Sequence, residues 1–434
     1  MSETYNHRTM FAAETLEQRV LLSAGDFLDT GPFVSDSDVH DAAPVVQPPG
    51  GGSYVDPVFH TTIRRLTATP SPTPGHSSPG TVPEYSKVQA WNCDNSRLLL
   101  RGTNADWWLY DGSTLSGRKQ VNVACGDIEP RWSKTDPNRF YYLSEDKVLA
   151  YDVRTRKSKL IVRFKGAGNL SSGAEQELPA DGRYFAVHGA MRYDRNGNFV
   201  STTAWVVDLK KRRRIGPWKK LSPPKYAPAG DSLDYVAITP DSKYVIAMWD
   251  HGTDLYTTRW KFVRRLTHWA EHADFAQYGP GQYALVIAHY RGSAEKNDPG
   301  DPENNDETIE LIPLDGSRKR ILWLAPVYNL GIHISARNTK LPGWVFVSTY
   351  WDGTDQRPGP TPFENEVFAL SLDSTADHPI VRRLAHVYMN ARYDYWDEPH
   401  ATVRQDGRQI LFASNFGNFP ADQDYEDTYL IDLR

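Results

Sequence analysis

Three stretches of this chain share one pattern: Ile63-Arg64-Arg65-Leu66-Thr67, Val263-Arg264-Arg265-Leu266-Thr267 and Val381-Arg382-Arg383-Leu384-Ala385. Each consists of a β-branched residue, two arginines, a leucine and a small residue. Similar pieces that lie far apart in one chain indicate a repeat architecture. The first copy lies near the N-terminus and has no repeat unit in front of it. We therefore predict a ring in which the N-terminal strand, at about residues 58–66, completes the last unit.

Turns rich in Asp, Gly and Asn recur between apolar runs, as tight hairpins require. They are Cys93-Asp94-Asn95-Ser96, Ala180-Asp181-Gly182-Arg183, Pro240-Asp241-Ser242-Lys243 and Gln405-Asp406-Gly407-Arg408. The units open near Val88, Pro130, Gln176, Tyr235, His272, His333 and His400. Seven such units of about 40–50 residues predict an all-β fold, a seven-bladed β-propeller of four-stranded blades.

The turn motif and the strand supplied by the N-terminus resemble TolB-like and WD40-like propellers. The resemblance covers residues 58–434 and implies the architecture, not a function. Residues 1–57 are rich in Asp, Ser, Pro and Gly after Ala24, and we expect them to form a disordered export segment and linker.

The N-terminal string from Leu16 to Ala24, Leu-Glu-Gln-Arg-Val-Leu-Leu-Ser-Ala, resembles the LEPRxLL-type segment of large exported bacterial proteins. Here Gln18 replaces the proline of that family. The resemblance implies an exported protein, extracellular or at the cell surface or in the periplasm. The alternative is a short amphipathic helix that directs no export.

Composition excludes several classes of partner. The net charge of −5 provides no overall basic field for nucleic acid. No apolar run approaches the ~18 residues that a membrane-spanning helix needs.

The two cysteines, Cys93 and Cys125, either pair in an exported protein or remain as two small thiols. We expect a monomer.

Propeller topology brings the first residues of all inner strands to one mouth of the central channel. Three successive units place a histidine there: His272, His333 and His400. Three imidazoles with a carboxylate or a water suit Zn²⁺ or Mn²⁺, so we predict a metal site. Glu271, Asp274, Asp397 and Glu398 lie close enough in sequence to act as ligands or to orient the rings. The alternative is that these polar groups only cap strand ends.

Other residues near the start of the predicted inner strands indicate a site for an anionic or carbohydrate ligand. Arg131 and Arg337 can present paired donors to a carboxylate, and we assign them catalytic roles. The predicted ligand-binding residues are Glu129, Glu177, Asp274, Tyr395 and Trp396. Several aromatic residues could instead fill the gaps between blades.

The segments Gly331-Ile332-His333-Ile334-Ser335 and Glu398-Pro399-His400-Ala401 resemble oligogalacturonate lyases, which are propellers with a histidine-rich metal site. That family takes one metal ligand from a Gln and two from a His-x-His pair, and this chain has no such pair at His400. The resemblance implies β-elimination on a uronate, in which a metal or an arginine acidifies a C–H bond and a base removes the proton. We name His188 and His251 as candidate bases, with structural packing as the alternative for both.

Three functions therefore stay open at this point. The first is an exported propeller that binds an anionic polysaccharide or oligosaccharide without turnover. The second is a metal-assisted uronate lyase, and the third is a protein-interaction scaffold. The basic run Lys210-Lys211-Arg212-Arg213-Arg214 predicts a solvated hairpin tip, with contact to a polyanion as the alternative. The acidic insertion at residues 292–307 predicts a flexible loop.

Overall fold

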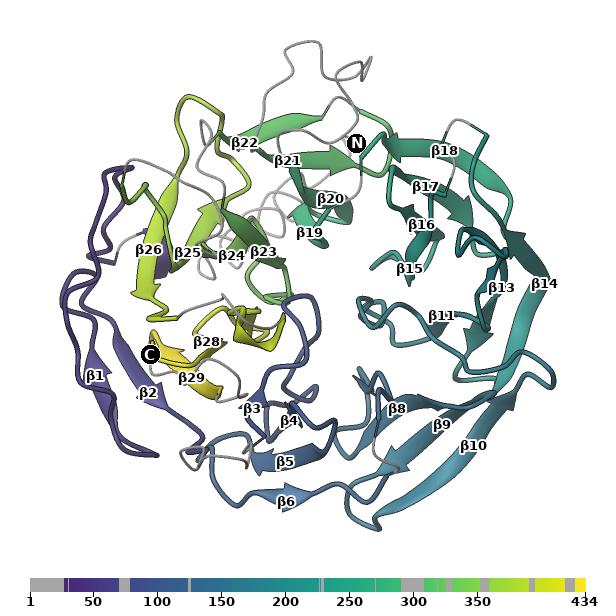
Figure 1. Ribbon diagram of the computed structural model, residues 1–434, viewed down its shortest axis with the longest axis horizontal. Helices are drawn as coiled ribbons and strands as arrows, with labels where there is room; N and C mark the ends of the chain where they lie inside the picture. The colour runs from purple at the N-terminus through teal and green to yellow at the C-terminus, as the bar shows by residue number, and fades with distance from the viewer. Residues whose placement is uncertain are drawn as a thin grey trace, which may run out of the picture.

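The fold is a ring of seven antiparallel sheets around one axis, as the computed structural model in Figure 1 shows. The structure describes residues 27–29, 31–69, 79–123, 126–225, 227, 230–269, 271–289, 308–317, 319–324, 330–351, 359–389, 395–417 and 426–434. The predicted all-β seven-bladed propeller is confirmed. In the described part of the chain, no helix is long and apolar enough to cross a membrane.

The first three blades lie in chain order around the ring. Blade 1 contains β3 (Thr81–Val82), β4 (Arg97–Gly102), β5 (Trp107–Asp111) and β6 (Lys119–Gln120). Blade 2 contains β7 (Arg131–Trp132), β8 (Arg139–Ser144), β9 (Lys147–Asp152) and β10 (Lys157–Arg163). Blade 3 contains β11 (Tyr184–His188), β12 (Arg192–Tyr193), β13 (Phe199–Asp208) and β14 (Arg213–Leu221), and its inner strand is reduced to a bridge between Ser171 and His188.

Blades 4 to 6 follow the four-strand plan without exception. Blade 4 contains β15 (Leu233–Ile238), β16 (Tyr244–Trp249), β17 (Gly252–Thr257) and β18 (Phe262–Thr267). Blade 5 contains β19 (Ala273–Gly279), β20 (Gln282–His289), β21 (Thr308–Pro313) and β22 (Arg320–Leu324). Blade 6 contains β23 (Gly331–Ser335), β24 (Trp344–Tyr350), β25 (Glu366–Ser371) and β26 (Val381–His386).

Blade 7 closes the ring with strands from both ends of the chain. Its C-terminal strands are β27 (Thr402–Val403), β28 (Gln409–Ser414) and β29 (Asp427–Asp432). The N-terminal strand β2 (Thr62–Arg65) pairs with β29 in the register Ile63 to Ile431, and β1 (Ser53–Val55) adds a fifth strand outside it. The predicted closure by the N-terminal strand is confirmed.

The repeated Arg-Arg pair has a structural explanation. The first arginine extends beyond its own sheet: Arg64 donates to the carbonyl of Thr114 in blade 1, and Arg264 donates to that of Asp315 in blade 5. The second arginine turns into its own blade, where Arg65 forms an ion pair of 2.6 Å with Asp427. Arg383 likewise binds Glu366 with two donors. In the first two copies the motif therefore couples the strand both to its own sheet and to the next blade, whereas Arg382 of the third copy donates to the carbonyl of Leu28 in the N-terminal segment.

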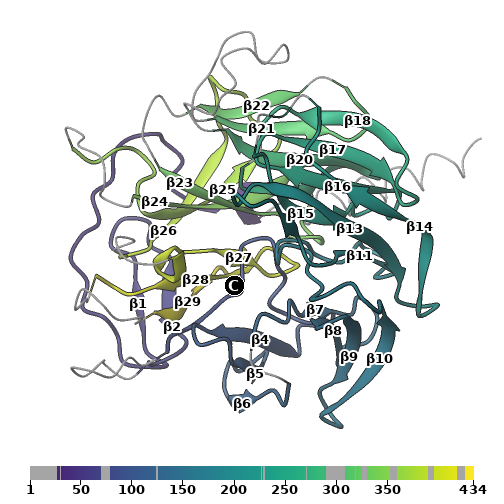
Figure 2. The same cartoon turned by 45° about the vertical axis from the view of Figure 1, so that its right-hand side comes forward.

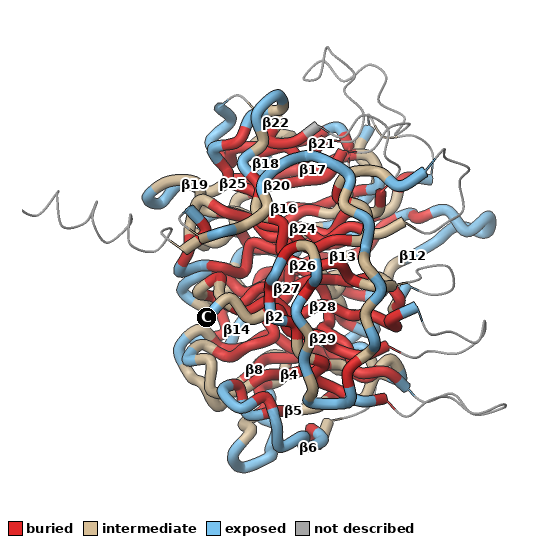
Figure 3. Tube along the Cα trace, turned by 90° about the vertical axis from the view of Figure 1, so that its left-hand side faces the viewer, coloured by how far each residue is buried: buried red, intermediate tan, exposed pale blue. Residues whose placement is uncertain are grey.

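Buried apolar side chains form seven clusters, each between two adjacent sheets. Leu66 and Leu430 of blade 7 pack against Leu98 and Leu100 of blade 1, so the ring is closed by apolar contact as well as by strand pairing. Figure 2 shows the sheets of blades 2 to 5 lying one after another, face to face. The buried backbone in Figure 3 lies in the middle of the sheets, with exposed stretches mainly at loops and outer edges.

Part of the segment before residue 57 lies against blades 6 and 7. Leu28 is fully buried in the cluster between them, and Val34 forms a bridge with Arg383. Asp56 accepts hydrogen bonds from the backbone and the ring of His386. The predicted export string lies outside the described residues, as do the acidic insertion at 292–307 and Cys125, so export and cysteine pairing stay predictions.

Candidate functional site

The three predicted histidines meet at one mouth of the channel. His272 directly precedes β19, His333 is in β23, and His400 stands two residues before β27. These are inner strands of three successive blades, so the fold brings the residues together although they are far apart in sequence. The ring centroid of His333 lies 4.4 Å from that of His272 and 4.4 Å from that of His400. His333 and His400 are fully buried.

A carboxylate joins the imidazoles. Glu398 Oε2 lies 2.8 Å from Nε2 of His333 and 3.3 Å from Nε2 of His400. Burial alone would raise the pKa of Glu398, but the hydrogen bond from His333 and the nearby His400 bring it well below its usual value. Glu398 is therefore an anion at neutral pH.

Burial keeps the imidazoles of His272 and His333 neutral. It lowers the pKa of His272 to about 4. Burial also lowers the pKa of His333, and the neighbouring rings of His400 and His272 add to this effect. Nδ1 of His272 lies 2.7 Å from Nδ1 of His333, and the hydroxyl of Tyr85 lies 3.1 Å from the same atom of His272. A hydrogen-bonded chain thus runs from Glu398 through His333 and His272 to Tyr85.

His333, Glu398 and His400 form a donor set that fits a divalent metal. One ligand atom from each residue lies within 4.8 Å of the others. Within the described residues, Nδ1 of His400 is buried without a hydrogen-bond partner, and its Nε2 contacts only Glu398, at 3.3 Å. A buried polar atom without a partner is costly unless a ligand satisfies it. Imidazole with carboxylate suits Zn²⁺ and Mn²⁺. Glu398 stands two residues before His400, the spacing of the missing His-x-His pair.

Residues 83–89 form a loop that sequence reasoning missed as part of the site. The loop interrupts the inner strand of blade 1, since β4 pairs with Thr81–Val82 on one side of it and with Trp91 on the other. Tyr85 reaches the histidines. Lys87 forms an ion pair of 2.6 Å with Glu175 and lies 4.3 Å from the ring centroid of Tyr235. The only sequence signal is that Tyr and Lys stand just before the predicted opening at Val88.

Two aromatic residues and an arginine flank the cluster of His333, Glu398 and His400. The ring of Tyr395 lies 4.5 Å from that of His400, and the ring of Trp396 lies 6.3 Å from it. Arg101 in β4 places its guanidinium 4.2 Å from the centroid of Trp396. In the described part of the chain Arg101 has no carboxylate partner, and its Nε is buried without a hydrogen bond. No pattern in the sequence indicates a role for Arg101, because only the fold places β4 beside Trp396.

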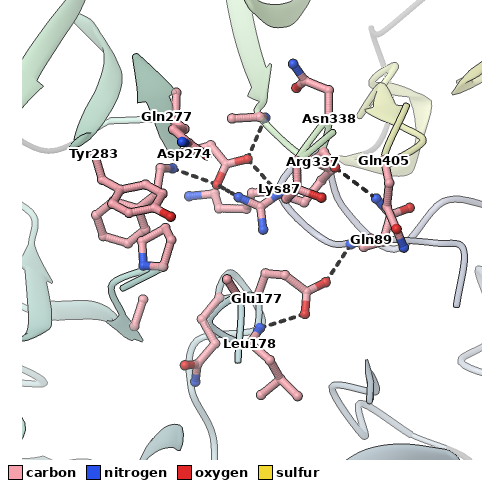
Figure 4. Close-up of a pocket in the computed structure, with 18 of the residues that line it drawn as sticks. Lys87, Gln89, Glu177, Leu178, Asp274, Gln277, Tyr283, Arg337, Asn338 and Gln405 are labelled. Carbon is pink, nitrogen blue, oxygen red and sulfur yellow. Dashed lines mark hydrogen bonds and ion pairs between the residues drawn. The ribbon is translucent and has the colours of Figure 1, made fainter. Parts of the chain in front are cut away.

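The far end of the channel forms a cavity of about 300 Å³, drawn in Figure 4. Asp274 and Arg337 lie there, two and four residues along the inner strands from His272 and His333. Arg337 binds Asp274 with two donors, and one of these contacts measures 2.9 Å. Glu177 accepts a hydrogen bond of 2.9 Å from the backbone of Gln89. These three predicted residues therefore lie deeper in the channel than the histidine cluster.

Arg131 and Glu129 take part in internal bonds. The fully buried guanidinium of Arg131 lies 3.0 Å from both oxygens of Glu84. Glu129 accepts hydrogen bonds from the backbone and the hydroxyl of Ser172. The charged groups of Arg131 and Glu129 are thus already paired within the protein. Their roles in catalysis and ligand binding stay predictions.

The two predicted bases lie in other surroundings. His188 is buried at the end of β11, and its Nδ1 lies 2.9 Å from the carbonyl of Gly189. His251 follows β16 and lies 3.1 Å from Asp231. The structure gives neither of them a contact with His272, His333 or His400 within the described residues.

This architecture defines a class: a seven-bladed propeller with a buried His-Glu-His cluster at one channel mouth. An oligogalacturonate lyase from Vibrio parahaemolyticus is similar, with a TM-score of 0.59 and 14% identity over 88% of this chain and 96% of that one. An oligogalacturonate lyase in complex with manganese is also similar, with a TM-score of 0.58 and 16% identity over 89% and 97% of the two chains. No family model and no curated protein sequence matches this chain. At such identities the likeness establishes the fold.

Proposed function

We propose that this protein binds a carboxylated saccharide, a uronate, at a divalent metal held by His333, Glu398 and His400. The observation that carries the proposal is the buried donor set of two imidazoles and one carboxylate, in which Nδ1 of His400 has no hydrogen-bond partner among the described residues. A protein bears the cost of burying such a group when a ligand satisfies it. The structural neighbour in complex with manganese supports the choice of metal.

Two outer residues would orient the ligand set. If Nε2 of His333 holds the metal, its Nδ1 carries the hydrogen and donates it to Nδ1 of His272, 2.7 Å away. The hydroxyl of Tyr85, 3.1 Å from the same nitrogen, is a second partner for it. His272 is therefore assigned the role of orienting His333.

The saccharide would lie over Tyr395 and Trp396. Tyr395 is exposed, which leaves one ring available to stack on a sugar. Arg101, held against Trp396 and without a carboxylate partner in the described chain, supplies paired donors for a second carboxylate of the ligand. A guanidinium that forms no ion pair within the described residues favours an anionic sugar over a neutral one.

β-Elimination is a second candidate, favoured by the likeness to two lyases. In this reaction a base removes the proton on the carbon next to the carboxylate, the bond from the adjacent carbon to the glycosidic oxygen breaks, and a C=C bond forms. The leaving oxygen takes up a proton. When bound, the metal would withdraw electron density from the carboxylate and acidify that proton.

Metal analysis of the purified full chain tests the first proposal. We expect stoichiometric Mn²⁺ or Zn²⁺ that is lost in His333→Ala and His400→Ala and retained in His251→Ala. We also expect trigalacturonate to bind the metal-loaded protein, as measured by calorimetry, and not the metal-free protein. Absence of metal from protein incubated with either ion would contradict the proposal.

Ultraviolet absorbance of an unsaturated uronate separates the two candidates. Its appearance during incubation with polygalacturonate identifies a lyase. Binding of trigalacturonate without that absorbance, over a panel of uronate polymers, identifies a binding protein. Failure of both, with metal absent, would leave the interaction scaffold as the remaining function.

A further inference from the structure

A strongly basic groove lies between blades 2 and 3, away from the channel mouth. It encloses about 990 Å³ and is bordered by β10, by the start of β8 and by the hairpin tip that joins β13 to β14. Its cationic residues, which together define the basic groove, are Arg139, Lys157, Lys159, Arg183, Lys210, Lys211 and Arg212. Figure 1 shows β10 and β14 as the outer strands of neighbouring blades.

The groove has a charge opposite to that of the chain. Seven cationic side chains border it against the two carboxylates of Asp152 and Asp181, a net charge of +5 in a chain whose net charge is −5. Arg139 pairs with Asp136 at 3.0 Å, and Arg183 pairs with Asp208 at 3.0 Å. These two arginines are therefore partly neutralised from outside the groove.

The four lysines of the groove are different. Within the part of the chain that the structure describes, none of them forms an ion pair. They are the exposed residues Lys157, Lys159, Lys210 and Lys211. Four uncompensated cations in one groove raise the local positive potential and attract anions.

Two outer-strand arginines of other blades have structural partners. Arg264 and Arg320 donate to carbonyls of the next blade, those of Asp315 and Leu372. In the groove only Arg212 does this, with a hydrogen bond of 2.8 Å to the carbonyl of Leu160. Blade-to-blade bonding therefore explains one cation of this group and not the lysines.

The lysines form two rows. Lys157 and Lys159 stand two residues apart on β10, so their side chains leave the same face at a spacing of about 7 Å. Lys210 and Lys211 border the other side, on the hairpin tip. Repeated positive charges along a groove suit a linear polymer with repeated negative charges better than a single small anion.

We propose that the basic groove binds a linear carboxylated polysaccharide at a site separate from the channel mouth. The uronate chemistry of this polymer rests on the function proposed above. A nucleic acid is the less favoured polyanion, because single strands bind through exposed aromatic platforms. The groove is bordered by one aromatic residue, Tyr141, which is buried.

The test compares two triple variants of the full chain. Lys159→Ala/Lys210→Ala/Lys211→Ala removes three charges from the groove. Lys119→Ala/Arg195→Ala/Lys261→Ala removes the same charge from exposed positions elsewhere. Binding of long polygalacturonate, trigalacturonate and single-stranded DNA is measured over a series of salt concentrations, with the melting temperature as a check on folding.

We expect the groove variant to lose at least about tenfold affinity for the long polymer, with a shallower dependence of affinity on salt, because fewer counterions are released. The control variant should stay within about twofold of wild type. Trigalacturonate should bind all three proteins equally. If trigalacturonate fails to bind wild type while the groove effect persists, the channel proposal fails and the groove proposal stands.

Two results would overturn the inference. One is equal loss of polymer affinity in the groove variant and the control variant, which would reduce the effect to net charge. The other is tighter binding of DNA than of polygalacturonate through the same three lysines, which would identify the groove as a nucleic-acid site.

Discussion

Glu398 is the residue on which the proposed metal centre depends most directly. Its carboxylate lies between His333 and His400 and is the only anion among the three donors. Glu398→Gln keeps the shape and removes the charge, so we expect metal affinity to fall by at least about 10–100-fold. Titration with Mn²⁺ followed by calorimetry measures this change.

Glu177→Gln is the matched control for that prediction. Glu177 is also buried in the channel, but it pairs with Lys134 at the far end. Its variant should keep the metal affinity of wild type. An equal loss in both variants would mean that any change of charge in the channel disturbs metal binding, and the ligand role of Glu398 would be rejected.

Arg101 provides a second prediction at the level of single residues. Arg101→Ala removes the cation beside Trp396. A charge-assisted hydrogen bond contributes about 1.5–3 kcal/mol, so we expect the dissociation constant of trigalacturonate to rise by about 10–100-fold. A carboxyl-reduced trisaccharide should bind wild type and variant alike. A loss of affinity for the reduced sugar as well would assign Arg101 to packing.

The three histidines of the site could be predicted from sequence, whereas the residues of blade 1 that surround them, Tyr85 and Arg101, could not. His272, His333 and His400 occupy the same rank in three successive units, so repeat phase alone brings them together. Tyr85 and Arg101 come from blade 1, where the loop 83–89 breaks the repeat plan and β4 is not an opening strand. Their approach to the cluster depends on a loop conformation and on packing across the channel, which local patterns do not encode.

At the level of strands, the Arg-Arg motif predicts unequal contributions from neighbouring residues of β2. Arg65 is buried and bonds to Asp427, which also accepts a hydrogen bond of 2.7 Å from Thr67. Arg65→Ala leaves that carboxylate buried without its cation, and we expect a loss of about 3–5 kcal/mol in the free energy of unfolding. Arg64→Ala should cost less than about 1 kcal/mol, since its contact with Thr114 is long, at 3.5 Å.

Urea denaturation of the two variants measures the difference. Both substitutions remove one positive charge from the same strand, so each serves as the other's control. Similar losses in the free energy of unfolding would contradict the unequal contributions that we assign to Arg64 and Arg65. A loss of stability confined to Arg64→Ala would mean that the contact between blades 7 and 1 stabilises the ring more than the ion pair within blade 7.

The N-terminal segment supplies a pH-dependent contact on the outside of blade 6. Burial would lower the pKa of His386, but its hydrogen bond with Asp56 raises it above the usual 6.5. The same contact brings the pKa of Asp56 below 3.8, although burial alone would raise it. Glu366 also faces His386 and favours its charged form. Between pH 3.8 and pH 6.5 both His386 and Asp56 are charged, and the contact between them is strongest.

Stability should therefore fall on both sides of that range. The contribution of His386 is complete below pH 6.5 and is lost as the pH rises through its raised pKa. The contribution of Asp56 is complete above pH 3.8 and is lost as the pH falls through its lowered pKa. Melting temperatures of wild type should decline from about pH 6 to about pH 9 more steeply than those of His386→Gln. Parallel curves would show that this pair does not contribute to the decline.

For the whole molecule, the ring geometry links metal binding to stability. His333 belongs to blade 6, while Glu398 and His400 belong to blade 7, the blade that closes the ring. A metal shared between them would bind the folded ring and not the unfolded chain. By linkage it adds about 2.7 kcal/mol to the free energy of unfolding at a free metal concentration of 100 times its dissociation constant.

We therefore expect the melting temperature to rise with added Mn²⁺ and to fall after treatment with a chelator. The rise should continue with the logarithm of metal concentration, because the linkage term grows in that way. His400→Ala should abolish the shift, whereas Lys261→Ala, at the exposed residue just before β18 of blade 4, should retain it. A shift of equal size in His400→Ala would place the stabilising ion elsewhere, and the cluster at the channel mouth would then be a set of hydrogen-bonded imidazoles that joins blades 5, 6 and 7 without metal.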